Sequence, residues 1–198
     1  QDGFIQIAFI IITIIANRRG LNAAAAVGIV EKNHQLSVPD SVFHAFDFSA
    51  LAAQNIGAGK YDRAKQTLRY AMMIAIGFGL VVSILIQFIA APVVGLFTAD
   101  AAVILLGAQY IRGYIWDCIF AGVHFSFSGY FCACGKSGIS FLHNLIAILC
   151  VRIPGVYLTS KIFPHTLFPM GLATATGSLL SVIICIIAYR WLCEKSGK

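Results

Sequence analysis

The stretch SALAAQNIGAGKYDRAKQTLR, from Ser49 to Arg69, joins the end of an apolar helix to a dense basic turn. Gly57 and Gly59 are expected to end that helix, because glycine readily adopts the left-handed backbone that a helix C-cap requires. The basic residues of the turn, opposed only by Asp62, are Lys60, Arg63, Lys65 and Arg69. A loop of this charge beside an apolar helix is typical of the cytoplasmic side of a membrane protein.

The rest of the 198-residue chain is strongly apolar, with 59% hydrophobic residues, 11% charged residues and a mean hydropathy of +0.85. A membrane-spanning helix needs about 20 mostly apolar residues, and several such runs alternate with short polar turns. The residue-by-residue alternation of a membrane strand is absent. The composition therefore predicts an all-α integral membrane bundle. The net charge of +6 comes from basic residues at helix ends, so no nucleic-acid partner is expected.

The polar turns divide the chain into a predicted bundle of six transmembrane helices. The expected spans are residues 3–17, 21–56, 68–97, 101–133, 139–160 and 170–193. The second span is longer than a bilayer requires and contains Pro39, which predicts a kink. The first span is short for a bilayer and position 1 is Gln, so we expect the chain to belong to a longer protein.

The distribution of basic residues predicts the orientation in the membrane. One side receives Lys60, Arg63, Lys65, Arg69, Lys136, Arg190, Lys195 and Lys198, and the other receives Arg18, Arg19 and Lys161. This excess predicts that both ends of the segment lie in the cytoplasm. We expect the membrane to be the plasma membrane. On the sixth span, small residues recur three or four apart, at Gly171, Thr174, Ser178 and Ser181, which predicts close helix packing.

Asp117 is the sharpest candidate for a functional site. A charged side chain inside the hydrocarbon costs at least about 2.5 kcal/mol, and Asp117 lies midway along the fourth span in GYIWDCIFAGVHFSF. His124 lies two turns further along the same face. Two interpretations stay open: a salt bridge to another helix, or a proton- or sodium-binding carboxylate that faces a cavity. Arg152, beside Pro154, is expected to snorkel or to pair at an interface.

The second span carries a polar stripe whose members step by four, three, four and three residues. They are Asn33, Ser37, Asp40, His44 and Asp47. This spacing places them on one helix face, which predicts a lining for water or substrate that attracts cations and responds to pH. The alternative is a poorly inserted, exposed segment. Gln6 on the first span is a weaker candidate, because a lone amide more often bonds to a neighbouring helix.

Several other kinds of site are excluded. The six cysteines lie in or at the edges of apolar segments and are expected to be free thiols that pack as small hydrophobic groups. Cys132 and Cys134 lack the spacing of a zinc site. GYFCACGKS, at 129–137, lacks the spacing of a phosphate loop. Since no catalytic constellation is present, we expect neither an enzyme nor an organic or metal cofactor.

Several segments nevertheless match a known family. ALAAQNIGAGKYDRAK, at 50–65, resembles the helix-end and loop motif of the multidrug and toxic compound extrusion (MATE) transporters. LFTAD, CACGKSGIS, VRIPGVYL and FPMGLATATGSLLS resemble the same family in the same order. Together they resemble the carboxyl-terminal six-helix lobe of a twelve-helix transporter, which implies that the N-terminal lobe is absent from this chain. The polar stripe departs from the family, whose eighth helix is mostly apolar there.

The resemblance implies secondary-active efflux of organic cations or drugs by Na⁺ or H⁺ antiport, with two lobes that rock around a central cavity. The implied partners are a small cationic substrate, membrane lipid and the N-terminal lobe. Asp117 and His124 lie on the equivalent of the tenth helix, which bears a coupling carboxylate in some members. Gln6 stands near the position at which some family members have an acid on the seventh helix. A glutamine at this position cannot release a proton. Two alternatives stay open: a lipid-linked oligosaccharide flippase, and a non-transporting remnant or structural membrane subunit.

Overall fold

The computed structural model describes residues 2–36 and 48–196, and all regular structure in this part of the chain is helical. The elements are α1 (Asp2–Asn17), α2 (Leu21–Leu36), α4 (Phe48–Gly57), α5 (Tyr61–Gly95), α6 (Ala101–Tyr114), α7 (Asp117–Ala133), α8 (Ser137–Ala147), the π-helix η1 (Ile148–Arg152), α9 (Ile153–Ile162) and α10 (Phe168–Ser196). The predicted all-α fold is confirmed.

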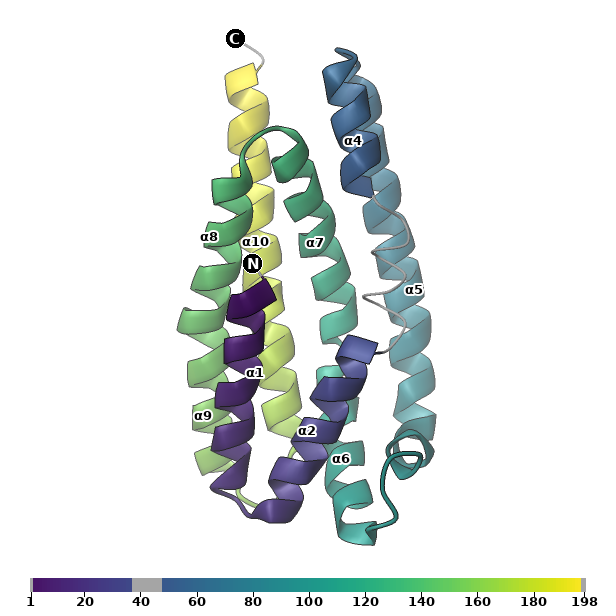
Figure 1. Cartoon of the computed structure of the whole chain (residues 1–198), viewed down its shortest axis with the longest axis vertical. Helices are drawn as coiled ribbons and strands as arrows, with labels where there is room; N and C mark the ends of the chain where they lie inside the picture. The colour runs from purple at the N-terminus through teal and green to yellow at the C-terminus, as the bar shows by residue number, and fades with distance from the viewer. Residues whose placement is uncertain (1, 37–47, 197–198) are drawn as a thin grey trace.

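The helices run close to the long axis of an elongated bundle (Figure 1). The central helix is α10, which packs against α6, α7, α8, η1 and α9. The turns α4–α5 and α7–α8 and the end of α10 lie at one end of the bundle, and the turns α1–α2, α5–α6 and α9–α10 lie at the other (Figure 1). Among the described residues, Lys60, Arg63, Lys136, Arg190 and Lys195 therefore lie toward the first end, and Arg18, Arg19 and Lys161 lie toward the other. The location of the first end in the cytoplasm stays a prediction.

Three helical segments are long and apolar enough to cross a membrane within the described residues: Tyr61–Gly95, Ser137–Ile162 and Phe168–Cys193. Ile5–Asn17 is apolar but shorter. The exterior of α5 suits lipid, since Phe88 is 79% exposed and is flanked by other exposed aliphatic side chains. A membrane bundle is thus supported, and the number of six spans stays a prediction.

The span expected over 101–133 is divided between two helices in the structure. The helix breaks at Ile115 and Trp116, between α6 and α7. Side chains from α5 bond to backbone carbonyls beside the break: Ser83 Oγ donates to the Ile115 oxygen at 3.2 Å, and Gln87 Nε2 donates to the Arg112 oxygen at 3.0 Å. These bonds add side-chain donors at a point where the regular helical hydrogen bonding is interrupted.

Prolines explain the other irregular turns. Proline lacks an N–H group and its ring clashes with the carbonyl four residues earlier. The wide turn of η1 ends two residues before Pro154. Ile89, three residues before Pro92, has non-helical angles of φ −108° and ψ 15° within α5. Pro39 and its predicted kink lie outside the described residues.

The buried apolar side chains form two clusters separated by a polar region. The first cluster joins α1, α2, α6, α9, the end of α5 and the start of α10, and the second joins α4, α7, the start of α5 and the later part of α10. Along α10, Met170 belongs to the first cluster and Cys185 to the second. The buried side chains between them include three polar ones, Thr174, Ser178 and Ser181. The middle of the bundle is therefore where polar chemistry is buried.

Two glycines occupy positions at which a side chain would not fit or would strain the backbone. Gly171 of α10 meets α6 so closely that a Cβ there would overlap the carbonyl oxygen of Tyr110 and lie 2.7 Å from the nitrogen of Tyr114. The predicted small-residue packing face of α10 is thereby confirmed. Gly59 has a φ of +71° just after α4 ends at Gly57, which confirms the predicted helix stop.

Candidate functional site

A buried ion pair joins α7 to η1. Asp117 is the first residue of α7 and is 2% exposed, and Arg152 is the last residue of η1 and is 7% exposed. Nη2 of Arg152 donates a 2.9 Å hydrogen bond to Oδ2 of Asp117. Of the two interpretations of Asp117, the structure thus contains the salt bridge to another helix. The expected pairing of Arg152 is confirmed as well.

The surroundings hold Arg152 from two sides. Its guanidinium carbon lies 5.5 Å from the centre of the Phe9 ring on α1. A Cβ on Gly177 of α10 would lie 2.9 Å from the Arg152 Cβ, so the missing side chain makes room for the arginine. Within the described residues, Oδ1 of Asp117 and Nε of Arg152 find no hydrogen-bond partner. The 2.9 Å hydrogen bond is therefore the contact that holds Asp117 and Arg152 together.

A second carboxyl group is buried nearby on α2. Glu31 is 4% exposed, and Tyr110 Oη donates a 3.0 Å hydrogen bond to its Oε1. Thr13 Oγ1 of α1 lies 3.4 Å from its Oε2. Tyr110 also stacks on Tyr114, with ring centres 5.6 Å apart. Arg152 interacts electrostatically with Asp117, Tyr114, Tyr110 and Glu31.

These residues form one unit, which we call the charged cluster: Glu31, Tyr110, Tyr114, Asp117 and Arg152. It draws side chains from α2, α6, α7 and η1, and Thr13 and Phe9 add contacts from α1. An arrangement of two acids, one base and two phenols in a bundle interior binds or exchanges small cations more readily than it performs bond chemistry.

Sequence reasoning missed Glu31 as a site residue. Glu31 and Lys32 are the last two residues of the run AAAAVGIVEK, so Glu31 resembles one member of an exposed charged pair at a helix end. Lys32 is indeed exposed, whereas Glu31 is buried. The available signal was that Glu31 follows Val27 by four residues and Ala23 by eight, both of which are buried on the same face.

His124 joins a different polar group. It is 4% exposed on α7, and its ring lies edge-on to that of His143 at 5.7 Å. His143 is fully buried, with Nε2 2.8 Å from Ser128 Oγ and Nδ1 2.6 Å from Ser181 Oγ. Sequence reasoning gave His143 no role. The structure makes it a link among α7, α8 and α10.

The remaining predicted site residues are not brought into the charged cluster by the described structure. Gln6 is exposed on α1, two turns before Thr13. Asp40, His44 and Asp47 lie outside the described residues, so the polar stripe of the second predicted span is untested. Among the predicted candidates that the structure describes, Asp117 alone is part of the charged cluster.

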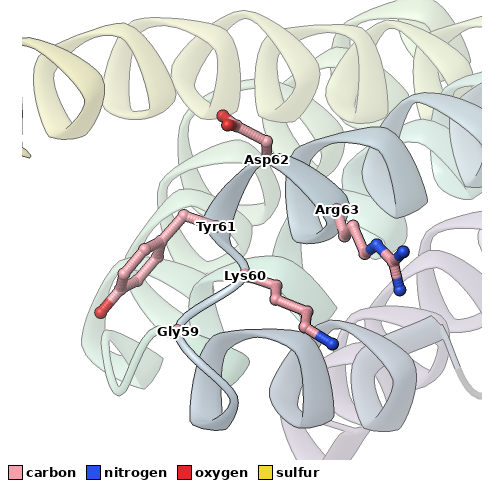
Figure 2. Close-up of a pocket in the computed structure, with 5 residues that line it drawn as sticks. All are labelled: Gly59, Lys60, Tyr61, Asp62 and Arg63. Atoms are coloured by element: carbon pink, nitrogen blue, oxygen red, sulfur yellow. The ribbon is translucent and has the colours of Figure 1, made fainter.

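The basic turn between α4 and α5 is an exposed surface feature. A shallow depression there is lined by Gly59, Lys60, Tyr61, Asp62 and Arg63. Figure 2 shows Asp62 pointing away from Lys60 and Arg63. The positive charge of the turn is therefore presented outward, as expected of a group that anchors membrane orientation.

Long apolar helices around a buried charged cluster define this chain as a polytopic α-helical membrane protein. Within that class its family is clear. The MatE family model matches residues 4–158, and the chain belongs to this family. Its relatives are transporters, which agrees with the expectation that the chain is not an enzyme.

Two curated relatives carry similar names. The probable multidrug resistance protein YoeA of Bacillus subtilis (strain 168) is 22% identical over 191 residues, which is 96% of this chain and 41% of YoeA. The probable multidrug resistance protein NorM of Halalkalibacterium halodurans is 25% identical over 147 residues, covering 74% of this chain and 31% of NorM. The chain therefore spans less than half the length of the relatives it matches.

Two solved structures share the fold. A mutant of the Vibrio cholerae MATE transporter VcmN superposes with a TM-score of 0.87 at 15% identity, covering 96% of this chain and 43% of VcmN. A MATE protein in complex with MaL6 gives a TM-score of 0.79 at 16% identity, with 94% and 42% coverage. The described bundle thus has the fold of about half of a MATE transporter.

Proposed function

We propose that this chain is the carboxyl-terminal lobe of a secondary-active exporter of organic cations or drugs in the plasma membrane. In this proposal an N-terminal lobe pairs with it, and antiport of Na⁺ or H⁺ drives alternating access around a cavity between the lobes. The observation that carries the proposal is the charged cluster, because acids buried in a membrane bundle are expensive and generally serve ion or substrate binding.

The proposed division of roles follows the positions of the residues. The coupling ion binds within the charged cluster, where Asp117 fixes the position of Arg152. Gln6, exposed on α1, and His124 line the route between cluster and substrate cavity. Asp40, His44 and Asp47 add acidic and titratable groups that attract a cationic substrate. Binding of the ion shifts the relative stability of outward- and inward-facing states.

The basic residues favour an exporter of cations over a flippase for lipid-linked oligosaccharides. A flippase would use Arg and Lys to hold phosphate groups. Arg112 is exposed, and Arg152 is already paired with Asp117. Within the described bundle, these arginines leave no buried cation free for a phosphate. A non-transporting remnant is disfavoured by the retention of a costly buried ion pair.

The test uses the protein produced from the complete reading frame, reconstituted in proteoliposomes with ethidium as a cationic probe. Sodium and proton gradients are imposed separately. We expect one of them to drive ethidium transport against its concentration gradient, and protein-free liposomes give the background. Ethidium movement equal to background under both gradients would refute export of organic cations by this protein.

A further inference from the structure

The two buried carboxyl groups of the charged cluster differ in their partners. Asp117 has a hydrogen-bonded guanidinium at 2.9 Å, so it is stable as an anion. The hydrogen-bond partners of Glu31 are hydroxyl groups, and no basic nitrogen lies within 4.0 Å of it in the described part of the chain. Arg152 acts on Glu31 only from a longer distance, and a buried carboxyl group without a directly bonded cation is more stable in its neutral, protonated form.

The hydrogen bonds around Glu31 indicate the same state. A hydroxyl group has one hydrogen to donate. Thr13 Oγ1 lies 2.9 Å from the Phe9 carbonyl oxygen and 3.4 Å from Glu31 Oε2. The shorter contact takes the threonine hydrogen, so Thr13 is at most a weak donor to Oε2 of Glu31. Tyr110 donates its own hydrogen to Oε1, which leaves Oε2 to carry the proton.

The charge of the cluster depends on that proton. The groups that face Glu31 are Thr13 of α1, Tyr110 and Tyr114 of α6, and Arg152 of η1. With Glu31 neutral, the charges of Asp117 and Arg152 cancel. Loss of the proton leaves one net negative charge, which attracts a monovalent cation. The cluster would thus bind either a proton or an organic cation, but not both at the same time.

We infer that Glu31 is the proton-binding group of this lobe and that it carries its proton in the conformation described here, while Asp117 stays ionised as the partner of Arg152. This assignment differs from the one implied by family resemblance, which points to Asp117. The role of Glu31 in coupling rests on the proposed export function. The presence of its proton does not.

Infrared spectroscopy of the purified full-length protein at neutral pH tests the proton directly, without any transport. The wild-type spectrum minus that of Glu31→Gln should contain the carbonyl-stretch band of a protonated carboxylic acid. A difference spectrum with carboxylate bands in its place overturns the inference. Because transport is not measured, this result is independent of whether the protein exports cations.

A second variant covers the case in which Glu31→Gln fails to fold. Tyr110→Phe removes the donor to Oε1, so the acid band should move to higher frequency, since a hydrogen bond to a carbonyl lowers its stretching frequency. Tyr130→Phe is the matched control, because Tyr130 is also buried but belongs to the second apolar cluster. An acid band that Tyr110→Phe leaves in place, or that Tyr130→Phe shifts equally, contradicts the inference.

Discussion

Arg152, the last residue of η1, donates a hydrogen bond across 35 positions of sequence to Asp117, the first residue of α7. The two irregular backbone segments and the ion pair occur together. If both segments were regular helices, the side chains of Asp117 and Arg152 would point in other directions. We therefore regard the irregular turns as part of how the charged cluster is built.

The ion pair predicts a large loss of stability when one partner is removed. Arg152→Gln leaves the Asp117 carboxylate buried without its cation, which we expect to cost about 3–5 kcal/mol. Thermal unfolding of the purified protein in detergent measures the effect. Arg112→Gln, at an exposed position, is the control and should change stability by less than about 0.5 kcal/mol. Equal melting temperatures for the two variants would contradict a structural pair.

The contact between α6 and α10 predicts that Gly171 cannot carry a side chain. Gly171→Ala forces a Cβ against the Tyr110 carbonyl, so we expect a destabilisation of about 1–3 kcal/mol or failure to fold. Gly77→Ala on α5 meets no atom within 4 Å and should leave stability unchanged or slightly raised. If both variants unfold at the same temperature as wild type, the close approach does not exist.

His143 is predicted to stabilise the junction of α7, α8 and α10. His143→Ala removes two hydrogen bonds to buried serines and leaves a cavity, with an expected cost of about 2–4 kcal/mol. Urea or thermal unfolding provides the measurement. His165→Ala, in the exposed loop before α10, should have no effect. A His143→Ala variant as stable as the His165→Ala variant would rule out the structural role.

The basic turn predicts the orientation of the lobe. In full-length protein whose native cysteines are replaced, Lys60→Cys should react with a membrane-impermeant maleimide only after the cells are opened. Arg18→Cys, at the opposite end of the bundle and also exposed, should react in intact cells. The reverse labelling pattern would mean that the lobe is inverted.

Much of the fold follows from local sequence patterns. Apolar runs, the glycine stop at Gly59 and the small-residue face around Gly171 each act over a few neighbouring residues, and the structure agrees with all of them. The break at Ile115 and Trp116 was not predictable, because neither residue is a helix breaker. It coincides with polar contacts from Ser83 and Gln87 on another helix.

The charged cluster was less accessible to sequence reasoning. Asp117 could be recognised because it is an acid in the middle of an apolar span, and Arg152 could be expected to pair, but nothing local joins the two. Glu31 was overlooked since burial at its position depends on how α2 packs against α1 and α6. Its partners Tyr110 and Thr13 come from separate helices, so only the tertiary structure brings the three together.

The central claim is that a proton on Glu31 couples to the export of a cation. It is tested most directly by ethidium transport in proteoliposomes that contain full-length wild type or Glu31→Gln, with an imposed proton gradient. We predict that the wild type moves ethidium against its concentration gradient, whereas Glu31→Gln only lets it equilibrate, because the glutamine cannot release a proton. Uphill, proton-driven transport by Glu31→Gln at the wild-type level would contradict the account.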